Sequence, residues 1–100
     1  MTLRREITQL SSEFRIAETD TFKKKIQKNE YKTVYKKIRA HVYSQLKKNP
    51  YFGRNIRKLK GDLKYLHRFR IGDYRLFYII DRDENLLYIT DLHHRKDAYR

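Results

Sequence analysis

The stretch Tyr65–Ile80, YLHRFRIGDYRLFYII, decides the fold of this 100-residue chain. Two runs of β-forming residues flank Gly72-Asp73, and a two-residue loop with glycine first is a signal for a β-hairpin. The opposed pairs in such a hairpin would be Ile71 with Tyr74, Arg70 with Arg75, Phe69 with Leu76, and Arg68 with Phe77. The stretch therefore predicts two antiparallel strands of known register.

The two faces of the predicted hairpin differ in chemistry. The apolar and aromatic side chains share one face, which we expect to belong to the core: Tyr65, Phe69, Ile71, Tyr74, Leu76, Tyr78 and Ile80. The other face places Arg70 directly opposite Arg75, with Arg68 on the same face. Opposed like charges destabilise a sheet by roughly 0.2–1 kcal/mol. This basic face therefore predicts a site for an anion.

The first half of the chain predicts one strand and two helices. Phe14–Ala17 alternates as a short strand does, and Glu18–Thr21 offers side chains that cap a helix N-terminus. Phe22 and Ile26 then lie one turn apart in a short helix. The apolar stripe of a longer amphipathic helix follows at Tyr31, Val34, Tyr35, Ile38, Val42 and Leu46. Asn49-Pro50 ends that helix, since proline disfavours helical geometry in the preceding residue.

The second half predicts strands joined by tight turns. Tyr51–Gly61 is a connecting segment in which a short edge strand is an open alternative, and the polar turn Asp81–Asn85 leads into a last strand, Leu86–Leu92. We therefore expect an α+β fold of order β-α-α-β-β-β, with two N-terminal helices packed on a mainly antiparallel four-stranded sheet. Residues 13–100 would form one domain, preceded by an N-terminal arm, residues 1–12, to which we assign no function.

The charge balance indicates a polyanionic partner. Lys and Arg number 25 against 12 Asp and Glu, which gives a net charge of +13. Such an excess of positive charge most often indicates binding to nucleic acid, and less often binding to an acidic protein or an anionic lipid. The absence of cysteine excludes disulfides and thiol catalysis. No apolar run approaches the ~20 residues that span a bilayer, so we expect a cytoplasmic protein without a membrane partner.

Metal and cofactor sites are not expected. His93 and His94 are neighbours, and neighbouring residues of a strand point to opposite faces, so the pair does not chelate one ion. His41 belongs to the long helix, and His67 lies on the apolar side of the hairpin. The three glycines match no phosphate-binding loop.

The C-terminal tail is predicted to approach the basic face. The last strand pairs back along the hairpin, which brings Arg95 and Tyr99 towards Arg70 and Arg75. A metal-free arginine cluster suits cleavage of RNA by its own 2′-OH, because arginines hold the phosphate and stabilise the charge that builds on it. Tyr99 or His94 could move the proton, and histidine suits this task better at neutral pH. The alternative is a cluster that only grips a nucleic-acid backbone.

Three segments together resemble the RelE/ParE superfamily of toxin–antitoxin toxins: KLKG at Lys58–Gly61, YLHRFRIGDYRLFYIID at Tyr65–Asp81, and LHHRKDAYR at Leu92–Arg100. The resemblance covers Phe14–Arg100 and implies the RelE-like form of the fold above, with a cognate acidic antitoxin as partner. RelE-like members are ribosome-dependent endoribonucleases that cut mRNA in the A site. ParE-like members share the fold and poison DNA gyrase.

The resemblance also implies roles for single residues. Arg75 matches the arginine of the family's G-x-Y-R hairpin, and Arg68 matches a catalytic basic position on the preceding strand. Arg95 matches the arginine after the last strand, and Tyr99 matches the terminal tyrosine of RelE-type nucleases.

One position departs from the nuclease pattern. Leu66 stands where those nucleases carry a second lysine, so that contact is missing or is supplied by Arg70. The predicted catalytic residues are Arg68, Arg75, Arg95, Tyr99 and His94, and the predicted RNA-binding residues are Arg70, Lys58, Lys60 and Lys96.

These observations favour a type II toxin that inhibits translation as a metal-independent endoribonuclease. It would act on mRNA in the ribosome and leave a 2′,3′-cyclic phosphate after attack by the 2′-OH. Two alternatives stay open: a ParE-like inhibitor of DNA gyrase without catalytic activity, and a nucleic-acid-binding module without catalysis.

Overall fold

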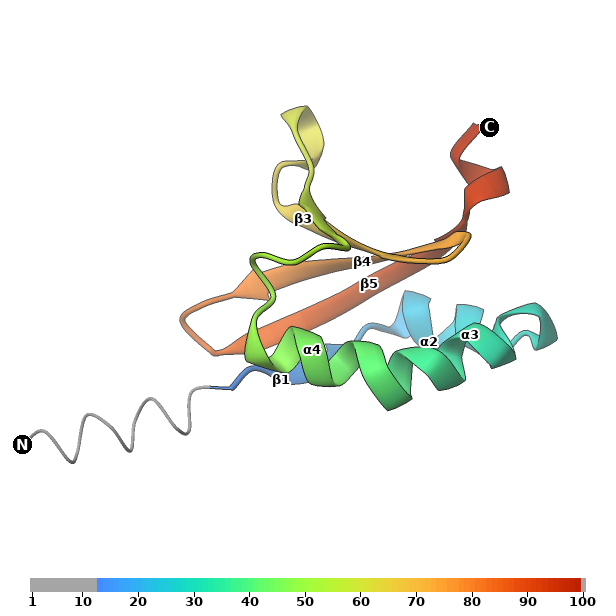
Figure 1. Ribbon diagram of the computed structural model, residues 1–100, viewed down its shortest axis with the longest axis horizontal. Helices are drawn as coiled ribbons and strands as arrows, with labels where there is room; N and C mark the ends of the chain where they lie inside the picture. Colours follow the sequence, from blue (N-terminus) through green and yellow to red (C-terminus); the bar gives the residue numbers. More distant parts are fainter. Residues whose placement is uncertain (1–12, 100) are drawn as a thin grey trace, which may run out of the picture.

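The computed structural model describes residues 13–99, so the predicted N-terminal arm lies outside the described residues. In chain order the elements are β1 (Arg15–Glu18), α2 (Asp20–Ile26), η1 (Asn29–Tyr31), α3 (Lys32–Lys37), η2 (Ile38–Val42), α4 (Tyr43–Lys48), β2 (Ile56–Lys58), η3 (Gly61–Leu63), β3 (Leu66–Ile71), β4 (Tyr74–Asp81), β5 (Leu86–His94) and η4 (Arg95–Tyr99). The predicted α+β class is confirmed: the helices pack on one face of a single sheet (Figure 1).

The sheet is mixed and has five strands in the order β1-β5-β4-β3-β2, so the prediction of four mainly antiparallel strands is wrong in detail. β1 runs parallel to β5, while the other neighbours are antiparallel. The additional strand is β2, which pairs with β3 along the far edge. β2 was not predicted with certainty because a three-residue strand shows almost no alternation of apolar and polar residues. The parallel pairing of β1 was not predicted because alternation within a strand does not reveal which strand it pairs with.

The hairpin of β3 and β4 has the predicted register. Ile71 opposes Tyr74, Arg70 opposes Arg75, and the remaining predicted pairs follow in step. Gly72 opens the turn with φ +56°, a left-handed conformation that glycine adopts without steric strain. The turn chemistry therefore fixes which side chains of both strands face the helices.

The long amphipathic helix is continuous over residues 32–48 but contains one wider turn. The structure forms a π-helical turn at η2, between α3 and α4. From Tyr31 to Leu46 the apolar stripe advances four turns at about 3.75 residues per turn, more than the 3.6 of an α-helix. A π-helical turn absorbs the surplus residue, so Ile38, Val42 and Leu46 all remain buried against the sheet.

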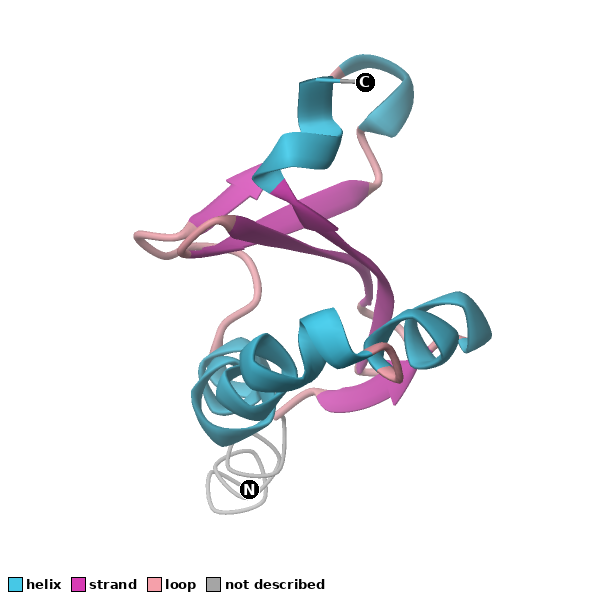
Figure 2. Ribbon diagram, turned by 90° about the vertical axis from the view of Figure 1, so that its right-hand side faces the viewer, coloured by secondary structure: helices cyan, strands magenta, loops and turns pink. Residues whose placement is uncertain are grey.

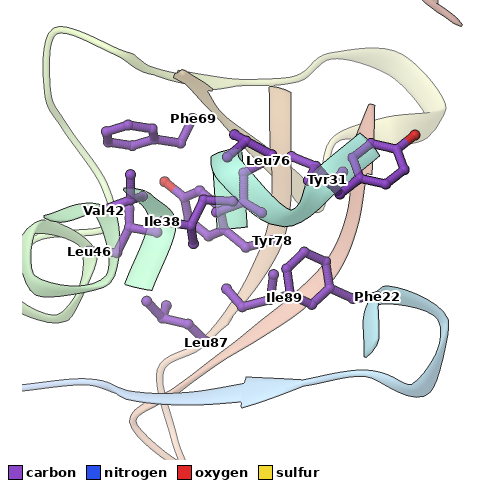
Figure 3. Close-up of a cluster of buried hydrophobic side chains, with 12 residues drawn as sticks. Phe22, Tyr31, Ile38, Val42, Leu46, Phe69, Leu76, Tyr78, Leu87 and Ile89 are labelled. Atoms are coloured by element: carbon purple, nitrogen blue, oxygen red, sulfur yellow. The ribbon is translucent and has the colours of Figure 1, made fainter. Parts of the chain in front are cut away.

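The core lies between the helices and one face of the sheet (Figure 3). Its buried side chains are Phe22, Tyr31, Val34, Ile38, Val42, Leu46, Phe69, Leu76, Tyr78, Leu87, Ile89 and Leu92. Tyr65 was expected here but is 69% exposed. The reason is that β3 begins only at Leu66, so Tyr65 precedes the part of the sheet that the helices cover. The α2 N-terminus is capped as predicted, with Thr19 Oγ1 accepting from the Phe22 N–H.

Glu18 ties β1 to the long helix. One of its carboxylate oxygens, Oε2, accepts hydrogen bonds of 2.7 Å from the hydroxyls of both Tyr35 and Tyr43. Burial, and then the bond to Glu18, raises the pKa of Tyr35 to about 12 and also raises the pKa of Tyr43. Both hydroxyls therefore stay protonated and keep donating at any physiological pH.

We predict that Glu18→Ala lowers the free energy of unfolding by about 2–3 kcal/mol, because two part-buried hydroxyls lose a charged acceptor. Glu18→Gln keeps a carbonyl oxygen in place and should cost less. Urea unfolding followed by circular dichroism measures both. Equal losses in the two variants would show that the tie does not depend on an acceptor oxygen at this position.

Candidate functional site

Four arginines gather on the face of the sheet that the helices leave uncovered. Figures 1 and 2 show α2, α3 and α4 along one side of the sheet, with η3 and η4 rising from the other. Arg57 of β2 opposes Arg68 of β3, and Arg70 of β3 opposes Arg75 of β4. We call these four residues the arginine face. Arg57 was not among the predicted site residues, because a three-residue strand gave no register for it.

The arginine face has unbalanced positive charge. Burial, and then the charges of Arg75, Arg57 and Arg70, lowers the pKa of the Arg68 guanidinium. Its Nε is buried and has no hydrogen-bond partner among the described residues. No carboxylate of residues 13–99 forms an ion pair with any of the four guanidinium groups. A buried donor without a partner and several like charges together favour a bound anion.

A β-bulge in β5 brings an acid and a histidine to the same side of the sheet. Phe77 opposes Asp91, but Tyr78 opposes Ile89, so Thr90 is an extra residue in β5. Its hydroxyl donates to the Phe77 carbonyl oxygen at 3.1 Å. After the bulge the alternation is shifted by one residue, so that His93 opposes Arg75.

His93 is held by a hydrogen-bonded network that starts on α2. Lys25 Nζ lies 2.8 Å from Asp91 Oδ1, and His93 Nε2 lies 2.9 Å from Asp91 Oδ2. Burial by itself raises the pKa of the Asp91 carboxyl, but hydrogen bonds from Lys25, the Leu92 N–H and His93 outweigh it and hold that pKa below its usual value. The His93 ring also packs edge-on against Phe77, with 5.0 Å between ring centroids. Asp91 is therefore a charged partner that orients His93.

A hollow of about 370 Å³ lies beside this network on the uncovered face. Its lining comes from η3, β3, β4 and β5: Leu63, Leu66, Phe77, Thr90, Asp91 and His93. Leu66, which replaces the second lysine of the nuclease pattern, forms part of this apolar wall. The hollow thus joins an apolar surface to a histidine and lies on the same face as the four arginines.

The predicted catalytic residues do not all share this face. Arg95 lies at the hairpin turn, where its N–H donates to the Asp73 carbonyl oxygen at 2.6 Å. His94 opposes Tyr74 and packs against its ring at 4.9 Å, on the side of the sheet that carries the helices. The backbone of Tyr99 belongs to η4, but its side chain is not described.

His93 was not among the predicted site residues, which included His94 instead. The signal was available, since neighbouring strand residues point to opposite faces and only one of the two histidines can share a face with Arg75. What could not be foreseen is the bulge at Thr90, which decides that this histidine is His93.

The predicted RNA-binding residues are also divided. Arg70 belongs to the arginine face, whereas Lys58 opposes His67 and so lies on the helix side of the sheet. Lys60 is exposed just before η3, and Lys96 is exposed within η4.

Within residues 13–99, no three His, Asp or Glu side chains come together in a way that could hold a metal ion. Over the same residues, none of the helices is long and apolar enough to cross a membrane.

Comparison with known proteins identifies the family. The family described as "ParE toxin of type II toxin-antitoxin system, parDE" has a sequence model that matches residues 16–99. The chain belongs to this toxin family. It is a toxin of the RelE/ParE superfamily, as its sequence motifs predicted. No curated protein sequence matches it significantly.

Solved structures share the fold of this toxin. The RelBE2 toxin–antitoxin complex of Mycobacterium tuberculosis contains a chain with a TM-score of 0.72 and 23% identity, over 83% of this toxin and 99% of that chain. YafQ from E. coli has a TM-score of 0.59 and 14% sequence identity, over 87% of this toxin and 99% of the YafQ chain. The YoeB/ParE toxin of Agrobacterium tumefaciens has a TM-score of 0.60 and 17% sequence identity, over 81% of this toxin and 98% of that chain. At these identities the likeness establishes the fold alone.

We predict that Asp91→Asn destabilises the toxin by about 1–2 kcal/mol at pH 7, because Lys25 and His93 lose a charged partner. The pKa of Asp91 is lower in the folded than in the unfolded toxin, so its charge stabilises the fold at any pH above the unfolded pKa. This stabilisation is lost as the pH falls from the unfolded pKa through the lower, folded pKa. The difference from the unmutated toxin should therefore shrink below about pH 4. Urea unfolding as a function of pH measures it, and a gap that does not depend on pH would contradict the charged state of Asp91.

Proposed function

We propose that this toxin is a metal-independent endoribonuclease that cuts mRNA in the ribosomal A site and thereby inhibits translation. The observation that carries the proposal is the combination of four uncompensated arginines with a histidine hydrogen-bonded to Asp91 on one open face. A surface that only gripped a nucleic-acid backbone would need the arginines but not an oriented histidine.

The chemistry follows from RNA itself. The 2′-oxygen attacks the adjacent phosphorus, the bond from phosphorus to the 5′-oxygen breaks, and the products carry a 2′,3′-cyclic phosphate and a 5′-hydroxyl. The 2′-OH loses a proton and the 5′-oxygen gains one. Negative charge builds on the phosphate during this exchange, and guanidinium groups stabilise it through bidentate hydrogen bonds. We assign this task to Arg68 and Arg75, with Arg70 beside them on the arginine face. Arg95, at the hairpin turn, stays a candidate from the family resemblance.

We assign proton movement to His93. Histidine moves protons readily at neutral pH, and a carboxylate that fixes its orientation is the usual companion of a catalytic imidazole. The 2.9 Å contact with Asp91 supports His93 over His94, which packs against Tyr74 instead. Tyr99 stays a second candidate from the family resemblance. Lys60 and Lys96 would contact RNA beyond the scissile phosphate.

The ribosome supplies what the arginine face lacks. In-line attack requires the 2′-oxygen, phosphorus and 5′-oxygen to be aligned, and such alignment lowers a barrier by many kcal/mol. Guanidinium groups alone do not align these three atoms, so the arginine face holds free RNA in many orientations. An mRNA fixed in the A site would present one backbone geometry to the arginines.

A cognate antitoxin is the second proposed partner. Three of the solved structures with this fold are RelB–RelE-type complexes of a toxin with its antitoxin. A net charge of +13 favours an acidic antitoxin, by steering the encounter and by charge complementarity at the interface. One specific observation favours a different target: the matching family is described by the name ParE. Gyrase inhibition is therefore the rival function.

Two assays on purified toxin distinguish these functions. We expect cleavage of mRNA on programmed ribosomes, almost none of naked RNA, and no effect on DNA supercoiling by gyrase. Arg75→Ala should slow cleavage by about 10²–10³-fold, the loss typical of one charge-stabilising donor. Arg39→Ala, an exposed arginine on the helical side, is the matched control. Inhibited supercoiling with intact ribosome-bound mRNA would make the gyrase function correct.

The two adjacent histidines test the proton assignment. We expect His93→Ala to slow ribosomal cleavage by about 10²–10⁴-fold, with a flattened pH–rate profile. His94→Ala should cost much less, because that ring lies on the other side of the sheet. Thermal unfolding of both variants checks that each remains folded. A larger loss in His94→Ala would return the proton-transfer role to His94.

A further inference from the structure

We propose that a pocket on the helix side of the sheet, on the opposite side from the arginine face, binds an unpaired nucleotide of single-stranded RNA. The pocket measures about 480 Å³ and lies where the chain leaves α4 and passes the start of β3. Its principal lining residues are Tyr51, Phe52, Lys58, Lys64, Tyr65 and Arg82. The inference rests on RNA being the toxin's substrate, but it concerns a different surface from the one that would cut it.

Aromatic rings at the pocket are exposed to an unusual degree. Phe52 is 79% exposed and Tyr65 is 69% exposed, and both are among the largest exposed apolar side chains of residues 13–99. The centroid of the Phe52 ring lies 6.4 Å from the centroid of the neighbouring Tyr51 ring. Lys64 Nζ lies 5.4 Å from the centre of the Tyr65 ring. Open rings flanked by cations are the stacking platforms on which proteins bind unpaired bases.

The charge around the pocket has one sign. Lys58, Lys64 and Arg82 line it, and none of the lining residues within residues 13–99 is acidic. None of these three cations forms an ion pair with a carboxylate of residues 13–99. The pocket therefore offers phosphate-binding groups beside apolar ring faces, a combination that matches a nucleotide better than a purely apolar or purely anionic ligand.

One wall of the pocket is a histidine ring. His67 lines it and stacks on the buried Tyr78 ring at 5.5 Å. Burial, and then the charge of Lys58, lowers the pKa of His67, so its ring is neutral at pH 7 and carries one donor and one acceptor. Its Nδ1 is buried and has no hydrogen-bond partner among the described residues. The ring is thus a neutral wall of the pocket that is held against Tyr78.

The edge strand β2 connects the two surfaces. Arg57 opposes Arg68 and faces the arginine face, whereas the next residue, Lys58, faces the pocket. An RNA strand that crosses this edge would meet a cation on both sides of the sheet. An acidic peptide could bind the same cations. Unlike RNA, however, it does not carry a planar ring in every residue that could stack on the exposed aromatic side chains.

Binding of a 2′-O-methyl oligoadenylate of about eight nucleotides, which the toxin cannot cleave, tests the proposal by fluorescence anisotropy. We expect Tyr65→Ala to weaken binding about tenfold, since one lost stacking contact has that effect. Lys64→Gln should also weaken it, whereas Lys36→Gln, the same charge change on an exposed helical lysine, should have a much smaller effect. The effect of Tyr65→Ala should persist in an Arg75→Ala background, because the two surfaces lie on opposite faces.

Two results would overturn the inference. If only Arg75→Ala weakens oligonucleotide binding, the arginine face is the sole RNA site and the nuclease proposal stands alone. If Tyr65→Ala leaves RNA affinity unchanged but weakens the complex with the antitoxin, the pocket is a protein-docking site. Circular dichroism of each variant shows that it is folded, and Tyr65 is exposed enough for its loss to leave the core intact.

Discussion

The register of the β3–β4 hairpin determines on which face of the sheet each charged and each core side chain of these two strands lies. The turn closes in two residues because Gly72 adopts φ +56° without strain. Side chains alternate along a strand, so a slip of one residue would turn the arginines of both strands into the core and the buried aromatic residues out to solvent. The uncovered arginine face and the packed helix side are therefore two results of one turn.

The bulge at Thr90 is a second, local adjustment of register. Without the extra residue, β5 could not keep both Ile89 and Leu92 in the core, because they are three positions apart. The bulge keeps both buried and places His93 opposite Arg75. The π-helical turn in the long helix has a similar effect, since it keeps Leu46 in phase with Ile38. In both places an extra residue preserves the core and changes the direction in which the later side chains of the same element point.

The sequence predicted the parts of the fold that depend on local chemistry. Hairpin pairing, the Thr19 cap and the apolar stripe of the long helix follow from turn residues and periodicity, and the structure has them all. Pairing between strands that are distant in the sequence could not be predicted, because nothing in the residues of β1 shows that it pairs with β5 in parallel. Three of the four arginines of the candidate site, Arg68, Arg70 and Arg75, were identified because they share one face of a hairpin. His93 was missed because the bulge at Thr90, which shifts the alternation of β5 by one residue, was not recognised in the sequence.

The uncompensated arginines have a consequence for the isolated toxin. Four guanidinium groups that repel one another store free energy in the folded state, and unfolding releases it by moving them apart. Dissolved salt weakens such repulsion over distances of about 10 Å at 0.1 M. Raising the ionic strength should therefore make the free toxin harder to unfold, the reverse of what is seen when surface ion pairs hold a protein together. A polyanion bound to the arginine face would also stabilise the folded toxin, and far more strongly than dissolved salt.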